Sequence, residues 1–227
     1  MHNENTGKSS NSDMDALEAE IREAVANGSH IQDTVHRLTL KAMNAQRIDL
    51  DSLQRIITAV MQGAHDGASQ QLQQATNQAH AAKSQITEAV AGLDSALARF
   101  AEASKLAIEE AAGQAKKFSD TELARTRSDL ESLESLFLET LHHTATAAQG
   151  LISDVLLDIS HHAKNTGTNV GSQLKETLAT FAQQVASVGH SQVEVGVSLA
   201  QKTADFVSKS ANGVLSGIKD QSKTGKH

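Results

Sequence analysis

The sequence predicts an all-α protein whose long amphipathic helices form an elongated antiparallel hairpin or bundle, or a coiled-coil-like assembly. Three observations predict this fold class. The 227 residues include no proline, the residue that kinks or breaks helices. Apolar positions recur with a period of about 3.6 residues along most of the chain. The chain has five Phe and neither Trp nor Tyr, so its apolar side chains suit thin contacts between helices better than the thick interior of an α/β enzyme.

The N-terminal region is expected to contain a disordered leader over 1–12 and two short helices over 13–48. The leader is polar, and Ser12 or Asp13 can cap the first helix. Asn27 and Gly28 would end that helix, because both residue types are common in turns. The second helix shows apolar residues at spacings of four, three and four, which is the pattern of one buried face.

One long helix is expected over 49–118, because its apolar ladder continues without a strong breaker and would give a rod about 100 Å long. Its glycines at 63 and 67 allow close helix approach or a bend. Ser119 and Glu122 have the spacing of a capping box, which indicates a new helix start. A return helix is therefore expected over 119–166, folded back along the long one.

The last segment is expected to form an amphipathic helix over 167–219, followed by a disordered tail over 220–227. Its apolar stripe has a mean period of about 3.7 residues, which keeps the stripe nearly straight along the helix. Such a face can pack on other helices of the bundle, bind a partner helix or lie on a hydrophobic surface. The candidate binding residues are Val170, Leu174, Leu178, Phe181, Val185, Val188, Val193, Val197, Val207, Val214 and Ile218, with Lys175, Lys202 and Lys209 at the polar margin.

Histidines and carboxylates suggest a weaker alternative, a metal site. Glu139 and His142 have the Glu-x-x-His spacing that di-iron bundles place on one helix face, and Asp158 and His161 repeat it. Nineteen residues separate the two pairs, about 28 Å on one helix, unless the helix breaks at Gly150. Solvated histidines beside an apolar stripe are the simpler interpretation, so we expect neither a metal nor another cofactor.

Composition argues against several other functions. The chain has no cysteine, so it has no disulfide framework and no thiolate site. The net charge is −7, and all bases after Arg127 are lysines without stacking aromatics, which argues against nucleic acid binding. Nucleophile elbows and phosphate-binding glycine loops are missing, so we expect no enzyme and no small-molecule substrate. Without a signal peptide or a run of about 18 apolar residues, a cytoplasmic protein is the expectation.

Four stretches of the chain resemble an uncharacterised family of bacterial Ala-rich helical proteins. The resemblance covers most of the chain after about residue 13 and brings no function with it. These stretches are 30–43, 59–64, 137–141 and 162–171. The length, the Ala- and Gln-rich composition and the C-terminal helix are also similar to phasins, which coat intracellular polyhydroxyalkanoate granules. This second resemblance implies attachment to a granule surface.

The sequence thus predicts a non-enzymatic structural or interaction protein. It would self-associate as a homo-oligomer through Ala and Leu stripes and present its C-terminal helix to a granule, a lipid surface or a partner helix. Two alternatives stay open. One is a helical scaffold that binds another protein without surface activity, and the other is a His and carboxylate bundle that stores or oxidises iron.

Overall fold

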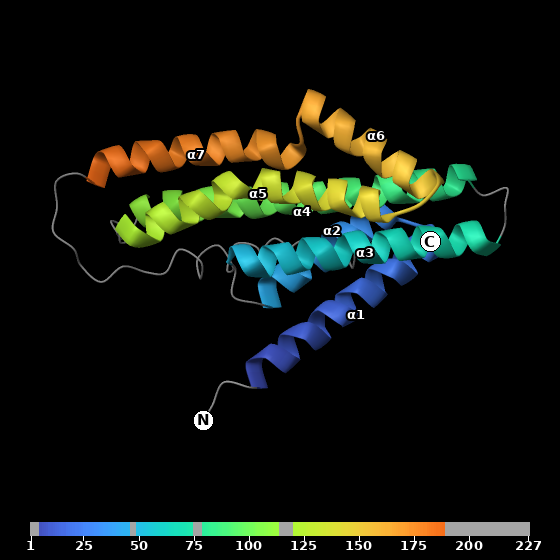
Figure 1. Ribbon diagram of the computed structural model, residues 1–227. Helices are drawn as coiled ribbons and strands as arrows, with labels where there is room; N and C mark the ends of the chain where they lie inside the picture. The colour runs from blue at the N-terminus through green and yellow to red at the C-terminus, as the bar shows by residue number, and fades with distance from the viewer. Residues whose placement is uncertain (1–4, 46–48, 75–78, 114–119, 189–227) are drawn as a thin grey trace, which may run out of the picture.

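The protein is all-α over the residues that the computed structural model describes, which are 5–45, 49–74, 79–113 and 120–188. These residues contain helices joined by short turns and no strand, as the sequence predicts (Figure 1). The helices are α1 (Asn5–Asn27), α2 (Ile31–Ala45), α3 (Leu50–Gln74), α4 (Ala79–Gly113), α5 (Asp120–Ala147), α6 (Leu151–Thr166) and α7 (Asn169–Val188).

Helix α4 is the central element of an elongated bundle. It contacts each of the other described helices, and its apolar residues Leu93, Leu97 and Ala101 are fully buried. Helices α3, α4 and α5 run along the long axis, whereas α1 leans away from it toward its N-terminal end (Figure 1). Helix α7 lies at the edge of the bundle beside α4 and α5. The core is therefore a thin layer of Ala, Leu, Ile and Val between helices, as the composition suggests.

Glycines bring two pairs of helices into backbone contact. A Cβ atom at Gly63 of α3 would lie 2.5 Å from the carbonyl oxygen of Glu18 in α1, and one at Gly67 would lie 2.6 Å from that of Arg22. Gly92 brings α4 equally close to α2. Only glycine, which has no Cβ, permits this approach. The pair at 63 and 67 therefore fixes how closely α1 packs on α3.

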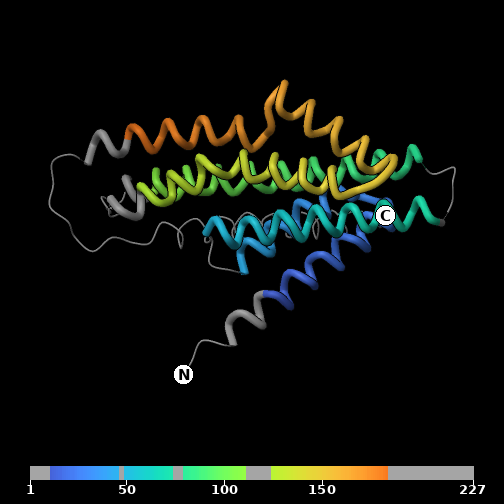
Figure 2. Tube along the Cα trace, in the orientation of Figure 1, coloured from blue at the N-terminus to red at the C-terminus, as the bar shows by residue number. Residues whose placement is uncertain are grey.

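The single helix expected over 49–118 is instead two helices, α3 and α4, that form a hairpin and pack on each other (Figure 2). Around the break, the apolar stripe consists of Ala68, Leu72, Ala75 and Ala79. Three of these four side chains are alanines, so a continuous helix would bury little surface here, whereas the hairpin buries the larger residues of both arms against each other. The ladder keeps its period on both arms, so its length alone does not reveal the reversal.

The return helix expected over 119–166 is also two helices, α5 and α6, with a turn between them. Gly150 lies in this turn with φ of +61°, a conformation that glycine adopts without strain. The Ser153 hydroxyl donates a hydrogen bond of 2.7 Å to the carbonyl oxygen of Ala145 across the turn. The two helices pack on each other, so this region folds back once more than expected.

The N-terminal end of the chain differs from the expectation. Helix α1 begins at Asn5, so most of the leader expected over 1–12 is helical, with no proline to stop the helix. At the other end, the helix expected over 167–219 is described as α7 up to Val188, and 189–227, including the tail expected over 220–227, lies outside the described residues. In the part of the chain that is described, no helix has the length and apolar character needed to cross a membrane.

Candidate interaction site at the C-terminal helix

The first half of the predicted binding stripe is buried inside the protein. Val170, Leu174 and Phe181 of α7 are at most 4% exposed, and Leu178 packs against the core at its edge. Among the described helices, α7 contacts α4 and α5. These residues therefore face the bundle rather than an external surface. The side chains of Val185 and Val188, and all of Val193, Val197, Val207, Val214 and Ile218, lie outside the described residues.

The N-terminus of α7 is capped by a side chain from another helix. The carboxylate of Asp94 in α4 accepts hydrogen bonds of 2.9 Å from the backbone N–H groups of Asn169 and Val170. Free N–H groups at the start of a helix carry partial positive charge, which an aspartate complements. Asp94 is 9% exposed, so this contact is buried. It joins residues 75 positions apart in the chain.

A second carboxylate, from α5, also holds the start of α7. The Thr168 hydroxyl donates a hydrogen bond of 2.6 Å to Glu134 and accepts one of 2.8 Å from the N–H group of Gly171. Thr168 is thus the local N-cap of α7, and Glu134 holds it in place. A Cβ atom at Gly171 would overlap the carboxylate of Glu134. The absence of a side chain at Gly171 makes room for that carboxylate.

Burial affects the protonation of the Asp94 carboxylate that caps α7. Desolvation raises the pKa of Asp94 above its ordinary value, while the hydrogen bonds from Val170 and Asn169 lower it in part. The negative charge of Glu134 nearby also raises it. The anchor therefore places two carboxylates close together and relies on the N-terminus of α7 to compensate them. We call Asp94, Glu134 and Thr168 the α7 anchor.

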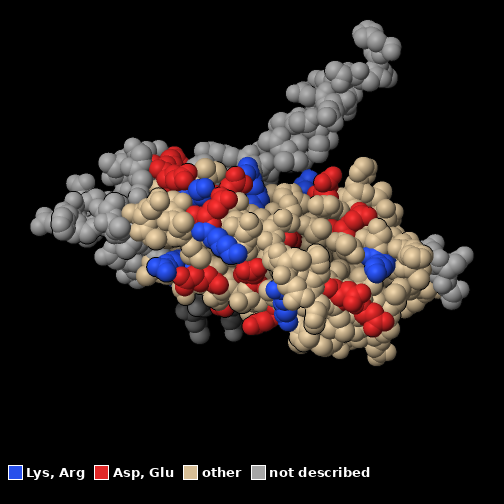
Figure 3. Space-filling model, turned by 90° about the horizontal axis from the view of Figure 1, so that it is seen from above, with Lys and Arg blue, Asp and Glu red and all other residues tan. Residues whose placement is uncertain are grey.

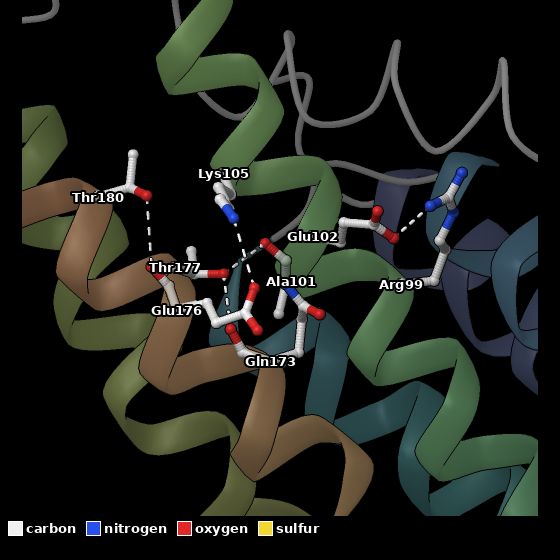
Figure 4. A network of polar contacts seen from close by, with 8 residues as sticks. All are labelled: Arg99, Ala101, Glu102, Lys105, Gln173, Glu176, Thr177 and Thr180. Atoms are coloured by element: carbon white, nitrogen blue, oxygen red, sulfur yellow. Dashed lines mark hydrogen bonds and ion pairs between the residues drawn. The ribbon is translucent and has the colours of Figure 1, made fainter.

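Polar contacts continue along α7 (Figure 4). The buried hydroxyl of Thr177 donates to the carbonyl oxygens of Ala101 in α4, at 3.0 Å, and of Gln173, at 2.9 Å. One turn away, the Nζ atom of Lys105 lies 3.4 Å from a carboxylate oxygen of Glu176, at the solvent-exposed edge of the two helices. Helix α7 is thus bonded to α4 at its start and near its middle.

These contacts fix the register of α7 on α4. Asn169 pairs with Asp94 and Thr177 with Ala101, so both helices run in the same direction with a nearly constant offset. Since both helices rise equally per residue, Val188 of α7 lies level with Gly113 of α4, and each is the last described residue of its helix.

Two open cavities flank the α7 anchor. One, of about 400 Å³, lies between α4, α6 and the start of α7 and includes Asp94, Phe137 and His162 in its lining. The other, of about 370 Å³, lies between α2, α4 and α7 and is lined by polar groups that include His36 and Arg99. Burial lowers the pKa of His36, and its Nδ1 atom is buried without a hydrogen-bond partner.

The candidate metal ligands do not form a cluster. Glu139 and His142 lie on α5, and Asp158 and His161 lie on α6, with all four exposed to solvent. The turn at Gly150 does fold the two helices together, but the described residues contain no group of three or more His, Cys, Asp or Glu able to hold a metal ion. The spacing of these histidines and carboxylates in the sequence therefore does not bring their side chains together as a metal site.

The exterior of the described region is polar. Among its residues, Leu157 on α6 is the exposed large hydrophobic side chain, at 38%. Acidic and basic side chains are interspersed over the face seen from above (Figure 3). The Ala and Leu stripes expected to drive self-association, such as Ala96 and Leu97, are used inside one chain. The large hydrophobic side chains of the described region are thus buried or half-buried, with Leu157 as the exception.

Sequence reasoning missed the α7 anchor. Thr168 shows a local signal, because a threonine just before an apolar ladder is a common N-cap. Asp94 shows a weaker one, since it lies four residues after Val90 on the edge of the apolar ladder of α4. No spacing rule connects Asp94 to a helix start 75 residues away, so the pairing itself becomes visible only in the folded chain.

The comparison with protein families identifies the chain. A family described as a family of unknown function (DUF6781) matches residues 7–223, so the chain belongs to that family. This agrees with the expected membership of an uncharacterised family. No curated protein and no solved structure matches the chain.

Proposed function

We propose that this member of DUF6781 is a non-enzymatic interaction protein that attaches to an apolar surface, such as a storage-polymer granule or a lipid membrane, through its C-terminal stripe. The observation that supports this proposal best is the contrast between the stripe and the described exterior. The sequence continues the stripe of α7 through Val193, Val197 and Val207, whereas Leu157 is the single large hydrophobic side chain exposed among the described residues. The apolar face of an amphipathic helix suits a hydrophobic surface.

The described exterior also supports this proposal. It is polar and exposes one large hydrophobic side chain among the described residues, so we expect the bundle itself to stay in water while the stripe binds. Lys202 and Lys209 lie between stripe residues and can reach toward polar or anionic groups at the surface of the apolar phase. The compositional similarity to phasins agrees with a granule as one such surface.

Sedimentation of the full chain tests this proposal. The probes are neutral phosphatidylcholine vesicles, vesicles that also contain phosphatidylglycerol, and polyhydroxybutyrate granules. We expect the full chain to pellet with at least one of them and a chain ending at Val188 to stay in the supernatant. This truncation removes only residues that follow α7, so every described helix is retained. Circular dichroism of both chains checks that their helix content is preserved. Equal pelleting of the two chains would contradict the proposal.

Matched substitutions sharpen the test. The double change Val197→Gln and Val207→Gln places two polar side chains on the stripe and should reduce binding about tenfold or more, because each removes an apolar contact with the surface. The control, Ser198→Gln and Ser210→Gln, makes the same polar additions at positions off the stripe. An equal loss in both variants would mean that the stripe does not carry the attachment.

A further inference from the structure

The second cavity beside the α7 anchor, between α2, α4 and the start of α7, is hydrophilic. It has a volume of about 370 Å³, and Ala98 is the one apolar residue in its lining. Helix α4 contributes Ser95, Arg99 and Glu102, whose spacings of four and three residues place them on one helix face. Helix α2 contributes His36. Two helices thus bring a basic side chain each to the same cavity.

Arg99 gives the cavity a permanent positive charge. Its guanidinium contacts the carboxylate of Glu102 one turn further along α4 (Figure 4), and the two side chains are 38% and 39% exposed. A guanidinium has five N–H donors in a planar fork, so it can hold more than one partner at a time. Arg99 can therefore bind an oxyanion that enters from solvent while it still contacts Glu102.

His36 gives the cavity a neutral hydrogen-bond donor. Its Nδ1 atom is buried without a hydrogen-bond partner. A hydrogen on Nδ1 would be a buried donor without an acceptor, so the neutral ring carries its hydrogen on Nε2. Burial lowers the pKa of His36, the charge of Asp33 on the same helix raises it in part, and the charge of Arg99 lowers it further. The ring is therefore neutral at pH 7.

The charges around the cavity favour an anion as its ligand. Arg99 and Glu102 balance each other while His36 is neutral. Helix α7 contributes uncharged side chains, which are those of Asn169, Ser172 and Gln173. Because the charge of Arg99 acts on His36, the two basic groups are close enough to share one anion, which would offset their repulsion. A cation would instead meet Glu102, the carboxylate of the lining, which is already paired with Arg99.

We propose that this cavity binds a small oxyanion, such as a phosphate or a carboxylate group, between Arg99 and His36. Ser95 and Ser172 line the same cavity, and their hydroxyls can donate further hydrogen bonds to the anion. The charge of the bound anion favours the protonated ring of His36, so anion binding is coupled to proton uptake. The site does not depend on the surface attachment proposed above, since its residues belong to α2, α4 and α7.

Anion titrations of the full chain at constant ionic strength test the site, with inorganic phosphate and succinate as the two probes. The ring signals of His36 in NMR spectra, identified with His36→Gln, report binding. We expect Arg99→Gln to weaken binding about tenfold and Glu102→Gln to strengthen it about threefold, because the latter removes a competing carboxylate. The matched controls, Arg127→Gln and Glu131→Gln, alter an exposed ion pair of 2.7 Å on α5 and should leave the affinity unchanged.

The outcomes separate the possible ligands. A response to phosphate alone, to succinate alone or to both supports the site and identifies the oxyanion that it accepts. Equal affinity of the parent and Arg99→Gln would place the bound anion elsewhere on the chain and overturn the proposal. His36 signals that neither probe shifts would overturn it as well. Arg99→Lys is a second variant that keeps the charge but not the planar fork, so it should lose part of the affinity.

The coupling to His36 is tested with sulfate, whose own charge is constant near neutral pH. Its affinity should rise about tenfold as the pH falls from about 7.5 to about 5.5, because the imidazolium adds a second positive charge. His36→Gln should abolish most of this rise, whereas His142→Gln, at an exposed position of α5, should keep it. The same rise in His36→Gln would mean that another group takes up the proton, which would overturn the role of His36.

Discussion

Two helix contacts in this protein are built in opposite ways. Helix α1 packs on α3 through glycines that leave no room between the backbones, with Ile21 and Val25 fully buried beside them. Helix α7 packs on α4 through three large side chains and a polar anchor at one end. The α1–α3 contact depends on close backbone packing along its whole length, so we expect it to open as a unit. The α4–α7 contact has separate bonds that can break one at a time, so we expect α7 to open locally.

The largest effect is expected where the backbones touch. Gly63→Ala together with Gly67→Ala would place Cβ atoms 2.5 and 2.6 Å from carbonyl oxygens of α1, which forces the helices apart. We expect a loss of about 2 to 6 kcal/mol in the free energy of unfolding, measured by urea denaturation, since overpacking costs about 1 to 3 kcal/mol at each of the two sites. Alanine otherwise stabilises a helix relative to glycine, so the sign of the effect is diagnostic.

The control for this variant is Thr58→Ala, an exposed position of the same helix. It should leave the free energy of unfolding within about 0.5 kcal/mol of the parent. A double glycine variant as stable as the parent would mean that α1 does not approach α3 closely in solution.

The second effect concerns the anchor and should be local. Asp94→Ala leaves the N–H groups of Asn169 and Val170 without their acceptor. We expect α7 to open more easily by about 1 kcal/mol, the usual value of a helix cap, with part of the loss offset because the buried charge is gone. Native-state hydrogen exchange would show faster exchange in α7 and unchanged exchange in α1 and α3.

Asp94→Asn provides the matched comparison, because its amide oxygen can still accept a hydrogen bond without carrying a charge. Its effect on α7 should be smaller than that of Asp94→Ala. If both substitutions speed exchange equally in α1, α3 and α7, then α7 opens only with the whole protein and the contrast between the two contacts does not hold.

The sequence predicts the fold class and much of the core but not the chain reversals. Leu93, Leu97, Leu130 and Phe137 belong to the predicted stripes and are all buried, because helical periodicity reports which face is apolar. Periodicity does not report where a helix turns back, since both arms of a hairpin repeat the same spacing. This is why α3 and α4 were expected as one helix.

The site shows the same limit. The stripe residues 170–181 could be identified from the sequence, but not their location, since an apolar face suits a bundle as well as an external surface. Their burial depends on the packing of α7 on α4 and α5, whose register includes the pairing of Asp94 with Asn169. Such a pairing between distant residues carries no local pattern.

A pH dependence is expected from the first half of the molecule. Burial lowers the pKa of His36 below 6.5, with the charge of Arg99 acting in the same direction and that of Asp33 against it. The unfolded chain therefore takes up a proton at His36 more readily than the folded chain does. Stability should be complete above pH about 6.5 and should fall as the pH is lowered through the window beneath that value.

Urea denaturation between pH 7.5 and pH 5 checks this, with His36→Gln compared with the parent. The variant should lose part of the pH dependence, whereas His142→Gln, at an exposed position of α5, should retain it. The effect should appear in the hydrogen exchange of α2, which carries His36, and of α4, on which α2 packs. Identical pH profiles of stability for the parent and His36→Gln would mean that His36 does not cause the pH dependence.

The smallest effect is expected at the exposed ion pair of α7. Lys105 and Glu176 lie 3.4 Å apart, but the Glu176 side chain is 62% exposed, and exposed pairs contribute between zero and about 1 kcal/mol because water screens them. Lys105→Ala should change the opening of α7 by less than about 0.5 kcal/mol, and 1 M salt should abolish even that difference. Measured by hydrogen exchange beside Asp94→Ala, this variant separates the buried cap from the surface pair. If Lys105→Ala makes α7 open more easily than Asp94→Ala does, then the exposed ion pair, and not the buried cap, contributes most to holding α7 on α4.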